Sequence, residues 1–173
     1  MIHKLQYDKF LELITENLQG DWVIIGGALL AVLNADGRAT ADIDMCPVGE
    51  LTNEMRLELM DLAIKAGLPI EAINPSADFF LRQIPNWKSA IVPFKKGLKG
   101  TIFRPSLELY LKLKLNRGTD SDIQDCVSFI KWHKKNLLEI DSEKIRHLLK
   151  EYQYEKIQII QDYLNGSKNF RMS

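Results

Sequence analysis

Hydrophobic residues in the first 33 positions follow two different spacings, which predict a helix, a strand and a second helix. The apolar residues of the first segment lie three or four positions apart: Tyr7, Phe10, Leu11, Ile14 and Leu18. This is the spacing of one face of an α-helix, so we expect an amphipathic helix over residues 4–18. Residues 22–25 (Trp-Val-Ile-Ile) form a short continuous apolar run, which is typical of a buried strand. Residues 28–33 then predict a short buried helix.

The middle of the chain alternates between strand and helix patterns. Residues 42–45 predict a second strand that stops at Pro47, and residues 53–66 predict a helix ended by Gly67. Residues 70–73 are interpreted as a third strand. An irregular segment, residues 74–89, follows and carries three aromatic residues among prolines: Phe79, Phe80 and Trp87.

Two further strands are expected at residues 90–94 and 101–103, because a Lys- and Gly-rich loop typical of a hairpin separates them. The segment 107–115 fits two patterns. Its leucines at 109, 111, 113 and 115 alternate as in a strand, whereas those at 107, 111 and 115 fit a helix. Pro105-Ser106 is a plausible helix start and unbranched Leu and Lys favour helix, so we predict a helix here.

From residue 121 onward the apolar stripes predict helices, and we expect residues 167–173 to form a frayed tail. The order of elements indicates an α+β fold in which helices pack on a mixed β-sheet, followed by a C-terminal helical segment. We expect an α/β core over residues 1–105, a helical part packed on it over residues 106–166, and the tail.

Composition narrows the functional classes. The chain has 173 residues with 23 basic and 23 acidic side chains, so no overall charge attracts nucleic acid. Local basic clusters such as Lys95-Lys96 remain candidate contacts, and no motif for reading DNA grooves is present. Cys46 and Cys126 lie far apart and match no zinc spacing. The sequence contains no signal peptide pattern and no membrane-spanning segment, so we expect a soluble cytoplasmic protein without membrane partners.

The densest chemical information lies around Gly26-Gly27. Paired glycines let a backbone turn sharply and approach a ligand, and the N-terminus of the following helix favours phosphate. Asp42 and Asp44 follow 15 and 17 residues after Gly27. On a strand their side chains share one face, where two carboxylates repel each other unless a cation lies between them. Hard oxygen ligands of this kind suit Mg²⁺, which also bridges to phosphates. The pattern therefore predicts nucleotidyl transfer.

Two blocks of sequence also resemble a known family. Gly26-Gly27 with the Arg-x-Thr-x-Asp-Ile-Asp stretch at residues 38–44 is similar to the DNA polymerase β-like nucleotidyltransferase superfamily. The likeness is strongest to its small prokaryotic branch, which includes the toxins of AbiE-type toxin–antitoxin systems. The second block, residues 109–125, resembles the helical Leu-x-x-Lys-Leu-x-x-x-Arg…Asp-x-x-Asp segment of that branch.

The resemblance implies roles for individual residues. Asp42, Asp44 and Glu71 would hold Mg²⁺ and act in catalysis, with Asp78 as the alternative third carboxylate. The residues that it implies in nucleotide binding are Gly26, Gly27, Arg38, Thr40, Lys112 and Arg117. Asp122 would orient the basic residues, although capping of a helix is its more ordinary role. Lys114 matches no position of the family pattern, and we expect its side chain to be solvated.

The leading hypothesis is a Mg²⁺-dependent enzyme that transfers NMP from an NTP to a hydroxyl group and releases pyrophosphate. The acceptor is RNA, protein or a small molecule, and the toxin-like resemblance implies an antitoxin protein as partner. A second hypothesis is a nucleotidyltransferase fold that binds NTP with weak or no turnover. A third is a plain interaction domain whose acidic residues lie at the surface.

Overall fold

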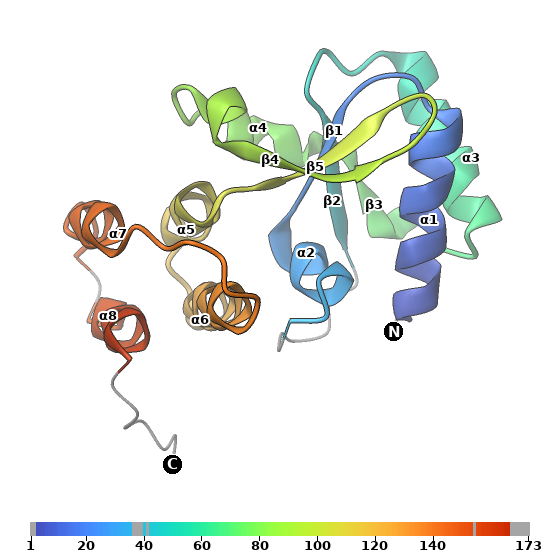
Figure 1. The fold of residues 1–173 in the computed structure, drawn as a ribbon. Coiled ribbons are helices and arrows are strands. Elements are labelled where there is room, and N and C mark those ends of the chain that lie inside the picture. Colours follow the sequence, from blue (N-terminus) through green and yellow to red (C-terminus); the bar gives the residue numbers. More distant parts are fainter. Residues whose placement is uncertain (1–2, 36–39, 41, 154, 167–173) are drawn as a thin grey trace.

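A five-stranded mixed sheet forms the centre of the molecule (Figure 1), in a computed structural model that describes residues 3–35, 40, 42–153 and 155–166. The strands are β1 (Trp22–Ile25), β2 (Ile43–Pro47), β3 (Ile73–Asn74), β4 (Ile91–Lys96) and β5 (Thr101–Pro105). Their order across the sheet is β3-β2-β1-β5-β4. β1 pairs antiparallel with β2 and parallel with β5, whereas β2 and β3 run parallel and β4 and β5 form the expected antiparallel hairpin.

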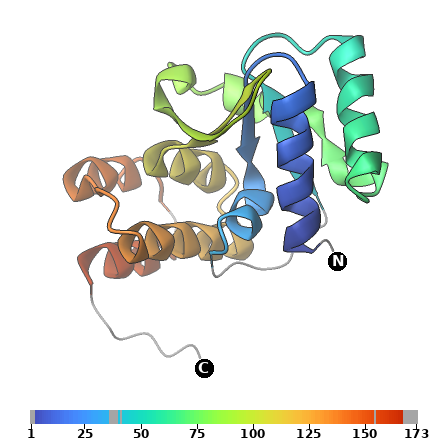
Figure 2. The ribbon, with the colours of Figure 1, turned by 45° about the vertical axis from the view of Figure 1, so that its right-hand side comes forward.

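The described residues form eight α-helices around this sheet. They are α1 (Lys4–Asn17), α2 (Gly26–Val32), α3 (Asn53–Lys65), α4 (Asp78–Arg82), α5 (Leu107–Leu115), α6 (Asp120–Lys135), α7 (Ser142–Leu149) and α8 (Ile157–Asn165). In the views of Figures 1 and 2, α1 and α3 lie to the right of β1 and α5–α8 lie to its left. The α+β class predicted from the order of elements is therefore confirmed.

The apolar run of β1 is explained by burial on both faces of the sheet. Successive side chains of a strand point to opposite faces. Trp22 and Ile24 belong to the main hydrophobic core, which they share with residues of α1, α2, α3 and α6. Val23 and Ile25 belong to a second, smaller cluster with residues of α4 and α5 such as Leu81 and Leu109. A strand covered on both faces has no polar positions, as the sequence shows.

Segment 107–115 is a helix, as predicted. The Ser106 side chain accepts a hydrogen bond from the Leu109 amide and so caps its first turn. Leu107, Leu111 and Leu115, the set with helical spacing, are all buried. The leucines also alternate because the helix is buried on a second side, where Leu109 packs into the smaller hydrophobic cluster.

The predicted strand at residues 70–73 is wrong for most of its length. Residues Ile70–Ala72 form a 3-10 helix, in which the Ala72 amide donates to the Pro69 carbonyl at 3.1 Å. This hydrogen bond is local to the turn, whereas a strand would pair with a neighbouring strand. Only Ile73 and Asn74 pair with β2, opposite Ile43 and Asp44. The segment expected to be irregular, residues 74–89, contains the short helix α4 between two 3-10 turns.

None of the helices in the described part of the chain combines the length and the apolar character needed to cross a bilayer.

Candidate active-site cleft

The turn from β1 into α2 places a glycine directly against a carboxylate. Gly26 has a φ of +70°, in the left-handed region that side-chain-bearing residues rarely adopt. Strand pairing puts Asp44 opposite Ile25, next to this turn. A Cβ atom built on Gly26 would lie 2.0 Å from Asp44 Oδ2, whereas one on Gly27 would make an ordinary 3.4 Å contact with Thr40. Only glycine fits at position 26, because of its backbone conformation and the close approach of Asp44.

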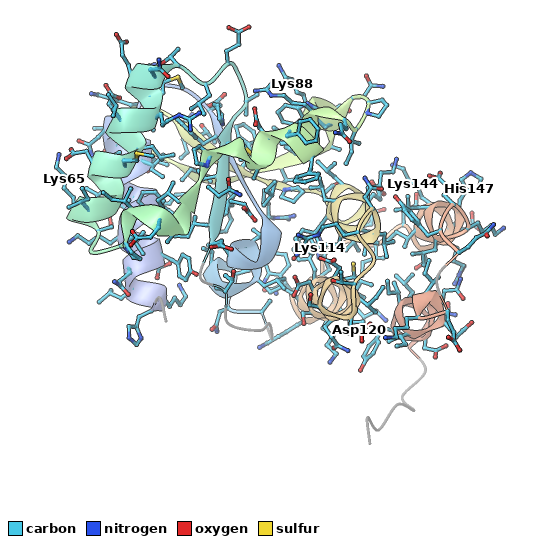
Figure 3. The ribbon with its side chains drawn as sticks, turned by 180° about the vertical axis from the view of Figure 1, so that it is seen from behind. Lys65, Lys88, Lys114, Asp120, Lys144 and His147 are labelled. Atoms are coloured by element: carbon cyan, nitrogen blue, oxygen red, sulfur yellow. The ribbon has the colours of Figure 1, made fainter. Side chains whose placement is uncertain are left out.

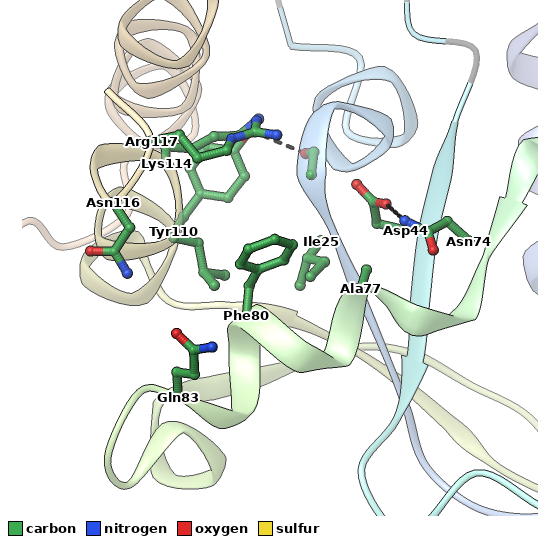
Figure 4. A pocket seen from close by; sticks show the side chains of 12 residues that line it. Ile25, Asp44, Asn74, Ala77, Phe80, Gln83, Tyr110, Lys114, Asn116 and Arg117 are labelled. Atoms are coloured by element: carbon green, nitrogen blue, oxygen red, sulfur yellow. Dashed lines mark hydrogen bonds between the residues drawn. The ribbon is translucent and has the colours of Figure 1, made fainter. Parts of the chain in front are cut away.

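A cleft of about 330 Å³ opens beside this turn (Figure 4). Volumes of this order are typical of small-molecule sites. The sheet contributes Ile25, Gly26, Asp44 and Asn74, and helix α5 with its C-terminal end contributes Tyr110, Leu113, Lys114, Asn116 and Arg117. The segment around α4 completes the wall with Ala77, Phe80 and Gln83. Polar and charged groups thus converge on one concave surface.

Asp44 is the acidic group of the cleft. Burial raises its pKa above the ordinary value of 3.8, and the nearby Asp42 carboxylate acts in the same direction. A 2.8 Å hydrogen bond from the Asn74 amide and the positive charges of Lys114 and Arg117 act to lower the pKa of Asp44. A carboxylate in this setting gains from a cation held close to it.

Lys114 supplies positive charge from the interior of the cleft wall. Lys114 is 4% exposed and lies between the helices and the sheet, in contrast to Lys65 at the periphery (Figure 3). Its Nζ lies 2.5 Å from Asp125 Oδ2 and 3.6 Å from Asp122 Oδ1. A buried ammonium group is retained as a charge when carboxylates compensate for its lost hydration.

Arg117 adds a second cation at the more open part of the wall. Its guanidinium donates to Asp122 Oδ1 at 2.6 Å, and this bond raises the pKa of Arg117. Asp122 also accepts hydrogen bonds from the Thr119 amide and hydroxyl, at 3.2 and 2.6 Å, as part of the capping box of α6. Burial alone would raise the pKa of Asp122, but the bonds from Thr119 and Arg117 hold that pKa below its ordinary value. Asp122 therefore both caps α6 and orients Arg117.

Tyr110 ties α5 to the glycine turn. Its hydroxyl donates to the Gly26 carbonyl at 3.2 Å, across a sequence separation of 84 residues (Figure 4). Its ring lies 5.7 Å from Lys114 Nζ and 4.5 Å from the Phe129 ring. The two sequence blocks, around Gly26 and around residues 109–125, are thus brought together by direct contact.

Several residues singled out in the sequence lie in or beside this cleft. Gly26, Asp44 and Arg117 line it. Asp42 is exposed and close enough to Asp44 to affect its pKa, and the Asp42 amide donates to Thr40 Oγ1 at 3.3 Å. Arg38 falls outside the residues that the structure describes.

Glu71, Asp78 and Lys112 are not brought to the cleft. Glu71 is exposed on the 3-10 turn before β3, and Asp78 pairs with Arg82 at 2.8 Å on α4. Lys112 lines a different cavity, together with Glu108, Lys144 and His147. Within the described ranges, no group of three or more His, Cys, Asp or Glu side chains is placed to hold a metal ion. The structure therefore does not bring Glu71 together with Asp42 and Asp44, and a metal site in this protein stays a prediction.

Lys114 and Asn74 line the cleft where the sequence predicted other residues, and the expectation that Lys114 is solvated is wrong because Lys114 is buried. Lys114 takes the place expected of Lys112, because it lies four residues after Tyr110 and so on the same face of α5. Asn74 takes the place expected of Glu71, since it pairs directly with Asp44. The signal for Asn74 was its position at the end of an apolar run, where a polar side chain can reach an edge site.

The side chains at this end of the cleft include oxygen groups of the kind that could hold a hard divalent cation. Asp42 and Asp44 offer carboxylate oxygens, and Asn74 offers an amide oxygen while its nitrogen donates to Asp44. Mg²⁺ in proteins is held by one or two carboxylates together with water and substrate phosphates. A three-carboxylate arrangement for two cations does not fit, because Asn74 is neutral.

The model of a family described as nucleotidyltransferase of unknown function (DUF6036) matches residues 4–170, nearly the whole chain. No curated protein and no solved structure matches the chain significantly.

Proposed function

The chain belongs to a family of nucleotidyltransferases of unknown function, and from this premise we propose that it transfers NMP from an NTP bound in the cleft beside Gly26. The acceptor is a hydroxyl group of RNA, protein or a small molecule, and pyrophosphate is released. The observation that carries the proposal is the convergence of a left-handed glycine turn, the carboxylate of Asp44 and the cations Lys114 and Arg117 on one cleft.

Each of these groups has a part in the proposed reaction. The glycine turn lets the backbone approach a phosphate, since no side chain stands between them. Lys114 and Arg117 attract the triphosphate, and Lys114 does so from a low-dielectric position where charge acts more strongly. Asp42 and Asp44 are the residues that we propose to hold Mg²⁺. The bound cation would neutralise charge that develops on the phosphates during transfer.

The partner we propose is an antitoxin protein. This part of the proposal is supported by the likeness of the two sequence blocks to AbiE-type toxins.

Transfer of label from α-³²P-labelled NTPs to total RNA or lysate protein, with and without Mg²⁺, tests the reaction. Asp44→Asn keeps the shape of the side chain and removes its charge, and we expect it to lower the rate by about 100-fold or more. Asp8→Asn is a matched control, because Asp8 is exposed on α1 and pairs with Lys4. Transfer by the parent that Asp44→Asn leaves unchanged would refute the proposed site.

A second candidate function is NTP binding with little or no turnover, and the neutral side chain of Asn74 opposite Asp44 favours it. Mg²⁺-dependent binding of NTP, without a labelled product, would identify this alternative.

A further inference from the structure

The chemistry of the cleft changes along its length. At one end lie the glycine turn, Asp44 and Asn74. Phe80 stands in the middle of the view in Figure 4, and Gln83 and Asn116 lie on its other side, away from Asp44 and Asn74. The first end carries the groups that suit a metal-bound triphosphate. The second end offers an aromatic ring and two neutral amides.

Phe80 is exposed to an extent that fold stability does not explain. Its side chain is 55% exposed although it is large and apolar, and it belongs to neither of the two buried clusters. Its neighbour Phe79 is 62% exposed, and the rings meet edge to face at 5.4 Å. Phe80 alone of the two lines the cleft. An exposed aromatic ring on the wall of a cleft is suited to stacking on a flat ligand.

The two amides supply polar contacts without charge. Asn116 Oδ1 accepts a 3.1 Å hydrogen bond from the Tyr152 hydroxyl, which fixes the side chain and leaves its amide nitrogen to donate to a ligand. Gln83 follows Phe80 by three residues just beyond the end of α4, and its side chain is exposed at the cleft. Neutral donors and acceptors beside a stacking ring match the edge and the face of a nucleobase.

We propose that Phe80, with Gln83 and Asn116, forms the nucleobase subsite of the cleft, so that the ligand is a nucleoside triphosphate and not any other polyphosphate. This inference rests on the proposed function, because it places the triphosphate at the Asp44 end. Leu113 and Ala77 also line the cleft and add apolar surface to it.

Calorimetric titration in the presence of Mg²⁺ tests this subsite. The ligands are each of the four NTPs and inorganic tripolyphosphate, which carries the phosphates but no base. Phe80→Ala should weaken the best-bound NTP by about tenfold or more, because stacking on an aromatic side chain contributes on this scale. Binding of tripolyphosphate should change by less than about twofold, since a lone phosphate chain has no surface for stacking.

Two further variants test whether the effect requires an aromatic ring at position 80. Phe80→Trp keeps an aromatic face and should retain NTP affinity. Phe79→Ala is the matched control, because it removes the neighbouring exposed ring that does not line the cleft. Both phenylalanines are exposed, so neither change should unfold the protein.

The outcomes separate the subsite from the function. If the parent binds NTP and tripolyphosphate equally, or if Phe79→Ala weakens NTP as much as Phe80→Ala does, the subsite is wrong while phosphate binding in the cleft stands. If the parent binds neither ligand, both the subsite and the proposed function are wrong. Selective loss of NTP affinity in Phe80→Ala, with recovery in Phe80→Trp, supports the subsite.

Discussion

Replacement of Gly26 by alanine tests the close packing at the centre of the cleft. Gly26→Ala places a side chain at a φ of +70°, which costs about 1–2 kcal/mol for a residue other than glycine. The new Cβ would start 2.0 Å from Asp44 Oδ2, and real Cβ contacts essentially never fall under 3.0 Å. The carboxylate oxygen must therefore move by about 1 Å, the difference between 3.0 and 2.0 Å. Displacements of this size at a reacting centre can cost about 100-fold in rate.

We therefore expect Gly26→Ala to lose about 1–2 kcal/mol of unfolding free energy and about 100-fold in nucleotidyl transfer. For a chain of this length the stability loss corresponds to a melting temperature lower by roughly 2–8 °C. Urea unfolding and label transfer measure the two effects. Gly27→Ala is the comparison, because its Cβ makes an ordinary contact and its backbone is helical. Equal stability and equal rates in the two variants would refute the reasoning.

Two further predictions concern the charged wall of the cleft. Lys114→Met leaves Asp125 and Asp122 buried without their ammonium partner, so we expect the free energy of unfolding in urea to fall by about 3–5 kcal/mol. For Lys112→Met, which changes a half-buried side chain in another cavity, we expect a fall of less than about 0.5 kcal/mol. Similar losses in the two variants would contradict the assignment of Lys114. Asp122 has a folded-state pKa below its ordinary value of 3.8, so its ionised form stabilises the fold above that pH and the contribution disappears as the pH falls through the folded-state pKa. Urea unfolding between pH 2 and pH 6 should accordingly show a shallower acid loss of stability in Asp122→Asn than in the parent, and parallel curves would contradict this.

The sequence identified the glycine turn and its helix because their signals are local. An apolar run buried on both faces, a pair of glycines and a short apolar helix need no knowledge of distant contacts. The same holds for the helix at residues 107–115, where Ser106 marks the start. The predicted boundaries of the two parts of the chain, at residue 105 and residue 166, remain predictions.

Which lysine faces the cleft depends on the rotation of α5, which its sequence pattern did not reveal. Successive residues of a helix turn by about 100°, so Lys112 and Lys114 point about 200° apart. Leucines surround both of them, so the pattern is apolar on nearly every side. Contact of Tyr110 with the Gly26 carbonyl sets the rotation, and that contact joins residues 84 positions apart.

The residue beside Asp44 could not be predicted for a different reason. An apolar run after a proline predicts a strand, but the hydrogen bond from the Ala72 amide to the Pro69 carbonyl makes a 3-10 turn first. The strand therefore begins three residues later than expected, and Asn74 lies opposite Asp44 where a carboxylate was predicted. Strand register is a tertiary property, and a short strand carries little local information about it.

A structure of the protein with Mg²⁺ and a non-hydrolysable NTP analogue tests the central claim most directly. We predict that the triphosphate lies against the Gly26 turn, with one cation between it and the carboxylates of Asp42 and Asp44, and with the base on Phe80. Nucleotide bound instead in the cavity that contains Lys112, or a cation held by Glu71, would contradict the account.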